Sequence, residues 1–148
     1  MTGLWVVAGV VVLGLFAGAL RYAREGRIRA AKKSKRALPA PVAEVIDPAG
    51  RVTLVQVSAS FCAPCRHAKA VLAPLAGRTE GLTHVELDVT DQPEVARALG
   101  VLRTPTTIAF TPDGTELLRV SGVPKGEEVL AALGEHLPAA DSPATRLT

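Results

Sequence analysis

Metal-ligating side chains are scarce in this chain, whose 148 residues include two cysteines and three histidines. A structural zinc site takes four ligands, which commonly come from two paired motifs. Cys62 and Cys65 supply one pair, whereas the histidines, His67, His84 and His136, lie in different predicted elements. We therefore expect no metal site, and nothing in the sequence indicates another cofactor.

The cysteine pair is also poorly placed for a purely structural disulfide. A bridge between Cys62 and Cys65 closes a very short loop, and the entropy that a disulfide removes from the unfolded chain grows with loop length. The gain in stability is therefore small. A reactive pair of thiols is the favoured interpretation.

Charged residues are absent from residues 3–20, GLWVVAGVVVLGLFAGAL. A helix of this length rises about 27 Å, close to the roughly 30 Å of a bilayer's hydrocarbon core. A buried helix of a soluble protein seldom runs this long without a polar residue, so we predict one transmembrane helix, with residues 1–20 as the anchor. A secretory signal peptide begins with a positively charged segment, whereas here only the amino terminus precedes the apolar stretch.

Positive charge is concentrated immediately after this stretch. Residues 21–36 hold eight arginines and lysines against one acid, a net +7, whereas the whole chain carries +3. Residues 37–148 therefore carry a net charge of −4, and the basic balance does not indicate nucleic-acid binding. The basic segment favours contact of residues 3–36 with anionic lipids, and the positive-inside rule places residues 21–148 in the cytoplasm. The reverse orientation is the alternative.

Proline-containing stretches divide the rest of the chain. Residues 21–41 are predicted as a basic juxtamembrane segment that ends in the linker ALPAP, where two prolines disfavour a helix. Residues 138–148 are small and polar, and we expect a disordered tail. Between these stretches, residues 42–137 are predicted to form one compact domain.

Alternating strand and helix patterns fill this domain. Strands are expected at residues 52–58, 83–89, 106–110 and 115–120, and helices at residues 62–77, 93–100 and 125–136. A crossover through a helix makes the first two strands parallel, and the TPDG turn makes the last two an antiparallel hairpin. The expected fold class is α/β, with a mixed four-stranded sheet and helices on both faces.

Three motifs occur together in this arrangement. CAPC, residues 62–65, stands where a strand leads into a helix; TPT, residues 104–106, precedes the third strand; and SG, residues 121–122, follows the hairpin. In this combination the chain resembles the thioredoxin family over roughly residues 42–136. The resemblance implies a thioredoxin-like fold and thiol-disulfide oxidoreductase activity.

The position of Cys62 at a helix start favours its thiolate form. Unpaired N–H groups and the positive end of the helix dipole stabilise negative charge there, and C-x-x-C thiols of this kind have lowered pKa values. Cys65 lies one turn further in and gains less. We expect Cys62 to attack a substrate disulfide and Cys65 to resolve the mixed disulfide, which are also the roles that the family assigns.

The resemblance adds expectations about the groups around the thiols. It implies that Pro105 has a cis peptide bond beside the thiols, and that the backbone of Thr104 pairs with an extended segment of the substrate. Ala63 and Pro64, between the cysteines, belong to the same substrate-binding surface. Phe61 stands where thioredoxins usually have a tryptophan, and we expect it to form an apolar lip for the substrate.

Two further positions depart from the thioredoxin pattern. Gln56 stands where the family commonly has a buried aspartate that accepts the proton of the resolving thiol, and Glu86 stands where the neighbouring strand usually has a lysine. We hypothesise that Glu86 is partly buried, has a raised pKa and assists the deprotonation of Cys65 as part of the catalytic set.

These features predict a membrane-tethered thiol-disulfide oxidoreductase that reduces protein disulfides, with an unidentified electron donor. The sequence leaves two alternatives open. One is an enzyme that faces the extracytoplasmic side and serves protein or cytochrome maturation. The other is a non-catalytic adaptor that keeps the thioredoxin fold.

Overall fold

The computed structural model describes residues 2–24, 26–31 and 37–138 of the chain. In chain order its elements are α1 (Thr2–Arg24), β1 (Ile28–Ala30), α2 (Ala40–Val45), β2 (Val52–Ser58), α3 (Ala63–Gly77), β3 (Leu82–Asp88), α4 (Pro93–Ala98), β4 (Thr106–Phe110), β5 (Glu116–Ser121) and α5 (Gly126–Leu133). The tail predicted to be disordered lies outside the described residues, apart from Pro138.

One mixed sheet organises the domain, with the strand order β1-β5-β4-β2-β3. β2 and β3 pair in parallel, as their helical crossover predicts, and the other pairings are antiparallel. The predicted α/β fold with a mixed sheet is confirmed. The number of strands differs, because the sheet has five strands rather than four.

The additional strand, β1, lies in the basic segment predicted to connect anchor and domain. It pairs antiparallel with residues 118–120 of β5, and Ile28 packs against the core beneath. Three residues with one large aliphatic side chain give no alternating pattern, so this strand forms because β5 offers an edge for pairing. The folded unit therefore begins before residue 42.

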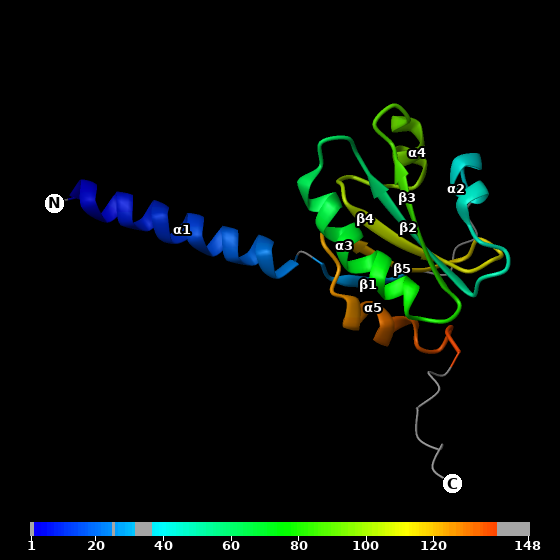
Figure 1. Cartoon of the computed structure of the whole chain (residues 1–148). Coiled ribbons are helices and arrows are strands. Elements are labelled where there is room, and N and C mark those ends of the chain that lie inside the picture. Colours follow the sequence, from blue (N-terminus) through cyan, green and yellow to red (C-terminus); the bar gives the residue numbers. More distant parts are fainter. Residues whose placement is uncertain (1, 25, 32–36, 139–148) are drawn as a thin grey trace, which may run out of the picture.

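Helices cover both faces of the sheet, as predicted (Figure 1). α3 and α5 pack against one face, where Leu54, Leu72 and Leu133 belong to a buried cluster. α2 and α4 pack against the other face, over a second cluster that contains Ile108 and Phe110. β2 is buried along its whole length, and its carboxyl end leads directly into the turn before α3.

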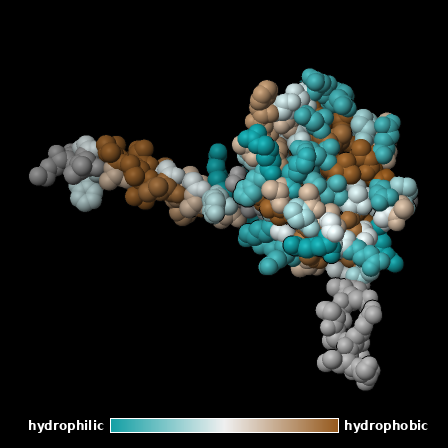
Figure 2. Space-filling view, viewed as in Figure 1, coloured by the Kyte–Doolittle hydropathy of each residue, from teal (hydrophilic) through white to brown (hydrophobic). Residues whose placement is uncertain are grey.

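Helix α1 extends away from the domain (Figure 1). Its described side chains are exposed, including Trp5 at 78% and Phe16 at 65%, and apolar residues cover much of its visible surface (Figure 2). It is therefore not a core helix of the domain. The stretch Trp5–Ala23 is long and apolar enough to cross a membrane, and the same length and composition also fit a signal sequence.

Candidate active site

The turn between β2 and α3 carries both cysteines. Phe61 adopts a positive φ of 62° after β2, and Cys62 is the N-cap residue of α3. A disulfide joins Sγ of Cys62 to Sγ of Cys65 over 2.03 Å, with the two Cα atoms 5.2 Å apart. The predicted pairing of the two cysteines is confirmed, and the structure represents the oxidised chain.

The two sulfur atoms differ in exposure and in contacts. Cys65 is 2% exposed, whereas Cys62 is half-buried. Sγ of Cys62 accepts a hydrogen bond from the backbone N–H of Cys65 over 3.2 Å, so this sulfur lies where the first-turn N–H groups and the helix dipole stabilise negative charge. Pro64 in the first turn costs the helix no hydrogen bond, because an N–H at that position has no partner within the helix. Cys62 is the accessible sulfur of the pair.

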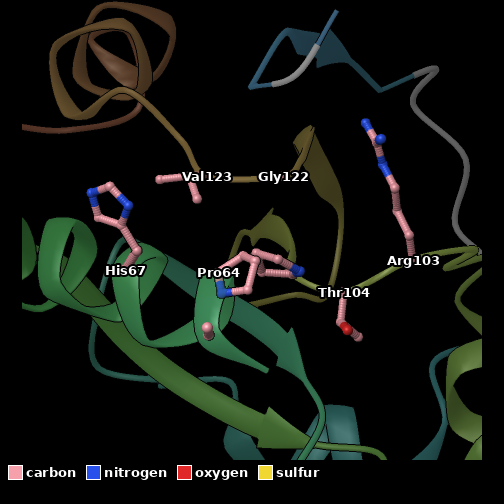
Figure 3. Close-up of a pocket in the computed structure, with 8 residues that line it drawn as sticks. Pro64, His67, Arg103, Thr104, Gly122 and Val123 are labelled. Atoms are coloured by element: carbon pink, nitrogen blue, oxygen red, sulfur yellow. The ribbon is translucent and has the colours of Figure 1, made fainter. Parts of the chain in front are cut away.

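A groove of about 440 Å³ lies beside the CAPC turn (Figure 3). Its walls come from the start of α3, the segment before β4 and the turn after β5. The lining residues are Ala63, Pro64, His67, Arg103, Thr104, Pro105, Gly122 and Val123. The Thr104–Pro105 peptide bond is cis, as the resemblance implies, and the N–H of Gly122 donates to the C=O of Pro105 over 2.8 Å. That bond joins two walls of the groove.

Thr104 offers its backbone to this groove. None of the described residues forms a hydrogen bond with its N–H or C=O, so an extended peptide in the groove finds a donor and an acceptor there, as at the edge of a sheet. The structure thus brings together four predicted site residues: Ala63, Pro64, Thr104 and Pro105.

Phe61 lies outside the groove and is fully exposed, at 101%. Leu102, two residues before Thr104, is 98% exposed, and the sequence pattern did not single it out. The positive φ of Phe61 is a left-handed backbone conformation, which costs a non-glycine residue about 1–2 kcal/mol. Such strain concentrates at functional sites. Large apolar side chains held in solvent on the two segments that form the groove fit a surface that docks a partner.

A buried polar pair lies behind Cys65. Gln56 is fully buried, and its side-chain amide donates to the C=O of Cys65 over 2.9 Å. The remaining amide oxygen can only accept, and it lies 3.1 Å from Nε2 of His84, so that nitrogen carries a hydrogen. His84 was not among the predicted site residues. Its spacing of two from Glu86 on one strand, which places both side chains on one face, is the sequence signal that would have identified it.

The prediction for Glu86 is wrong in the direction of its pKa. Glu86 pairs directly with Gln56 in the parallel ladder, but β3 is an edge strand and the Glu86 side chain is 30% exposed. Nζ of Lys69 on α3 lies 2.9 Å from Oε2 of Glu86. The hydrogen bond from Lys69 lowers the pKa of Glu86, whereas burial alone would raise it. A carboxylate held in its charged form by a lysine is a poor acceptor for a thiol proton.

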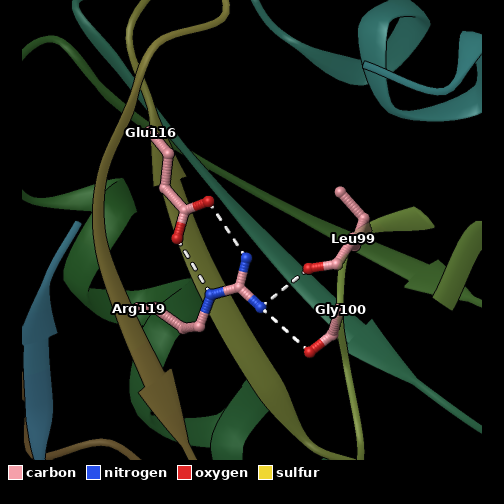
Figure 4. Close-up of polar contacts among 4 residues, drawn as sticks. All are labelled: Leu99, Gly100, Glu116 and Arg119. Atoms are coloured by element: carbon pink, nitrogen blue, oxygen red, sulfur yellow. Dashed lines mark hydrogen bonds and ion pairs between the residues drawn. The ribbon is translucent and has the colours of Figure 1, made fainter. Parts of the chain in front are cut away.

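Arg119 holds in place the segment that leads to the groove. Sequence patterns did not indicate this role of Arg119. Its guanidinium binds both carboxylate oxygens of Glu116, over 2.9 and 3.0 Å, and donates through Nη1 to the C=O of Leu99 over 2.8 Å (Figure 4). A longer contact, 3.4 Å, reaches the C=O of Gly100. Arg119 therefore ties β5 to the loop after α4, which continues to the cis proline.

His84 is expected to make the stability of the domain depend on pH. Burial lowers the pKa of His84 from its usual value near 6.5; the charge of Lys69 acts in the same direction and that of Glu86 in the opposite one. In the unfolded chain His84 takes up a proton near pH 6.5, whereas in the folded domain it does so only at lower pH. The contribution of His84 to the stability of the folded domain is therefore complete above pH 6.5 and is lost as the pH falls below it. Between about pH 7.5 and about pH 5.5, the urea midpoint of the wild type should fall, and that of His84→Gln should fall less.

The measurement is urea unfolding followed by far-UV circular dichroism at both pH values. His136→Gln is the matched control, because His136 is exposed after α5 and should leave the pH dependence as in the wild type. Equal falls in His84→Gln and the wild type would contradict this role of His84.

Comparison with known proteins agrees with this site. The thioredoxin family model matches residues 40–135. The chain is 34% identical over 87 residues to a thioredoxin of Staphylococcus saprophyticus, covering 58% of this chain and 83% of that protein. It is 35% identical over 79 residues to a thioredoxin H-type of Oryza sativa subsp. indica, covering 53% of this chain and 64% of that protein.

Among solved structures, a mutant thioredoxin of Halobacterium salinarum aligns with a TM-score of 0.59 over 70% of this chain and 89% of that chain. At 22% sequence identity, this likeness shows the fold alone. The family match, in contrast, spans more than half of the chain and includes the CAPC turn and Pro105. The chain therefore belongs to the thioredoxin family and is a thiol-disulfide oxidoreductase.

Proposed function

We propose that the chain is a membrane-tethered reductase of protein disulfides, with Cys62 as the attacking thiol and Cys65 as the resolving thiol. The observation that carries this assignment is the hydrogen bond from the N–H of Cys65 to Sγ of Cys62 at the N-terminus of α3. That contact and the helix dipole stabilise a thiolate on Cys62 once the disulfide opens. Cys62 is also the sulfur that a bulky protein substrate can reach, because Cys65 is buried.

The reaction consists of two successive thiol–disulfide exchanges. The Cys62 thiolate attacks one sulfur of the substrate disulfide, a mixed disulfide forms, and the other substrate sulfur leaves as a thiolate. Cys65 then loses its proton and attacks Sγ of Cys62, which restores the Cys62–Cys65 disulfide and releases the second substrate sulfur. Two electrons have passed to the substrate, and a dithiol electron donor reduces the chain again.

The proton of Cys65 needs an acceptor in the second exchange. Gln56, whose amide donates to the C=O of Cys65, cannot accept a proton, and Glu86 is held in its ion pair with Lys69. The substrate thiolate that leaves in the first exchange is basic and is released next to the site. We assign it, directly or through water, as the acceptor of this proton.

The groove supplies the place for the substrate chain. The substrate's cysteine approaches Cys62 over Ala63 and Pro64, and the substrate's backbone pairs with the N–H and C=O of Thr104. Phe61, fully exposed at the edge of the turn, contributes apolar contact next to the reacting sulfur. This arrangement reads an extended backbone and therefore suits many protein substrates.

Helix α1 provides the tether in this proposal. Its described side chains are exposed rather than packed on the domain, and the basic residues 21–36 begin in its last turn and continue after it. A positive flank on the carboxyl side of a span favours a cytoplasmic catalytic domain, with lysine and arginine side chains in contact with anionic lipids. The substrates are then proteins with disulfides on the cytoplasmic side of the membrane.

Labelling of the cysteines in intact cells tests this orientation. Cells that produce the full chain are first reduced with a membrane-permeant dithiol and then treated with a membrane-impermeant maleimide. We expect Cys62 to react only after the membrane is permeabilised. The chain has no other cysteines than Cys62 and Cys65, so the assay has no background from other positions.

The control places a cysteine on the other side of the span. In a chain with Cys62→Ser and Cys65→Ser, the additional change Thr2→Cys should be labelled without permeabilisation. Labelling of Cys62 in intact cells would reverse the orientation, and recovery of labelled Cys62 in the culture medium, on a chain that has lost its first residues, would indicate a cleaved signal sequence rather than a tether.

A further inference from the structure

Four arginines from different parts of the chain line a second cavity of about 320 Å³. They are Arg27 and Arg29 from the segment of β1, Arg103 from the loop before the cis proline, and Arg119 from β5. The other described residues that line it are small, polar or aliphatic, and none of these is acidic. The cavity is therefore a concentrated site of positive charge, whereas residues 37–148 carry a net charge of −4.

Two of these charges face each other directly. Arg29 and Arg119 are direct partners across the β1–β5 ladder, and like charges placed opposite each other destabilise a sheet. Glu116 compensates Arg119 (Figure 4). Within the described part of the chain, neither Arg27 nor Arg29 has an ion pair or a hydrogen bond from its side chain. Guanidinium groups bind carboxylate and phosphate oxygens through two parallel hydrogen bonds.

This cavity adjoins the groove beside the disulfide. Arg103 lines both, and Figure 3 shows its guanidinium pointing away from Pro64 and toward the ribbon of β1. Pro105 and Gly122 line the groove, and the residues next to them in the chain, Thr106 and Ser121, line the cavity. A peptide paired with the backbone of Thr104 would therefore bring a residue close to its reactive cysteine up to the arginines, because each extended residue spans about 3.3 Å.

We propose that this arginine cavity binds an acidic side chain of the substrate, located within a few residues of the cysteine that Cys62 attacks. The inference rests on the proposed disulfide reductase function and names the class of substrate that the site prefers: a disulfide flanked by aspartate or glutamate. An anionic lipid headgroup has similar chemistry. The shared wall with the groove favours the substrate, because a peptide bound in the groove lies directly next to the cavity.

The test uses pairs of disulfide-linked peptides that are identical except for glutamate or glutamine at one position, scanned over the residues around the reactive cysteine. The reduced full chain in a neutral detergent is the enzyme, and kcat/KM is measured for each peptide. At one or more positions, the glutamate peptide should be reduced about tenfold faster than its glutamine partner at low salt. The preference should shrink as salt is added, because salt screens exposed charges.

Arg29→Gln should reduce the ratio of the two kcat/KM values toward one. Arg27→Gln should have the same effect, and because residue 27 lies just outside β1, this change leaves the residues of the strand as they are. Arg51→Gln is the matched control, because Arg51 is an exposed arginine at the opposite end of β2 from Cys62. It should keep the wild-type ratio.

The outcomes separate this inference from the proposed function. Equal reduction of both peptides by the wild type at every position would overturn the inference and leave the reductase function intact. Failure to reduce either peptide would count against the function itself. If the arginine variants change only the response of the rate to added phosphatidylglycerol and not the ratio between peptides, the cavity serves a lipid and the inference is wrong.

Discussion

Replacement of Cys62 by serine is expected to abolish disulfide reduction, with a loss of about a thousandfold or more in the rate. Sγ of Cys62 is the accessible sulfur and accepts the N–H of Cys65 at the start of α3, so it forms the first bond with the substrate. A serine hydroxyl at this N-cap keeps the hydrogen bond to the helix but supplies no thiolate. The rate is measured as reduction of a model protein disulfide by the full chain in detergent, with a chemical dithiol as electron donor.

Cys65→Ser is the informative partner of this variant. It should lose turnover to a similar extent but accumulate a mixed disulfide on Cys62, visible by mass spectrometry and reversible with excess dithiol. Both serine variants should keep the far-UV spectrum of the wild type. Turnover by Cys65→Ser with trapping by Cys62→Ser would reverse the assignment of the two thiols. A wild-type rate no higher than that of the dithiol alone would leave the fold as an adaptor.

The redox centre could be predicted because its chemistry depends on local sequence. The N-cap position of Cys62 follows from a strand that leads into a helix, and Pro64 fits only the first turn of that helix. The partner segment with Thr104 and Pro105 is remote in sequence, and the family resemblance supplied its location. The structure confirms the disulfide and the cis proline.

Which side chains surround the thiols depends on the order of the strands in the sheet, and the sequence does not show that order. Glu86 is expected to be partly buried with a raised pKa, and it does pair with Gln56 in the ladder. β3, however, is the outermost strand, so Glu86 reaches Lys69 at the surface of α3 and its pKa falls instead of rising. His84 contacts Gln56, whose side chain in turn contacts the backbone of Cys65. This contact depends on which side chains share a face of β3.

The strand β1 shows a second limit of sequence patterns. A three-residue segment with one isoleucine, one arginine and one alanine shows no strand preference that could be recognised in the sequence. It joins the sheet because β5 would otherwise present an open edge, and this pairing is what brings Arg29 opposite Arg119. The positive charge of residues 21–36 predicts contact with lipids. In the folded chain, Arg27 and Arg29 from this segment line the cavity beside the groove.

Phe110→Ala is expected to have the largest effect on stability, lowering the free energy of unfolding by about 3–5 kcal/mol. Phe110 is the largest of the fully buried side chains, and it stands at the end of β4 in the cluster that holds α2 and α4 on their face of the sheet. Truncation leaves a cavity among residues from several elements, which cannot close by moving one of them. A domain of this size has a total stability of only about 5–15 kcal/mol.

The measurement needs a probe outside α1. The chain's single tryptophan and single tyrosine, Trp5 and Tyr22, both lie in α1, so intrinsic fluorescence reports on that helix rather than on the domain. Urea unfolding in detergent is therefore followed by far-UV circular dichroism or by amide hydrogen exchange of β2 and β4. Leu102→Ala is the matched control: its side chain is 98% exposed, and its loss should change stability by about 0.5 kcal/mol or less. A similar midpoint for Phe110→Ala and Leu102→Ala would mean that the cluster beneath α4 contributes little, and that the loop to Pro105 is held in place chiefly by Arg119 and its contact with Leu99.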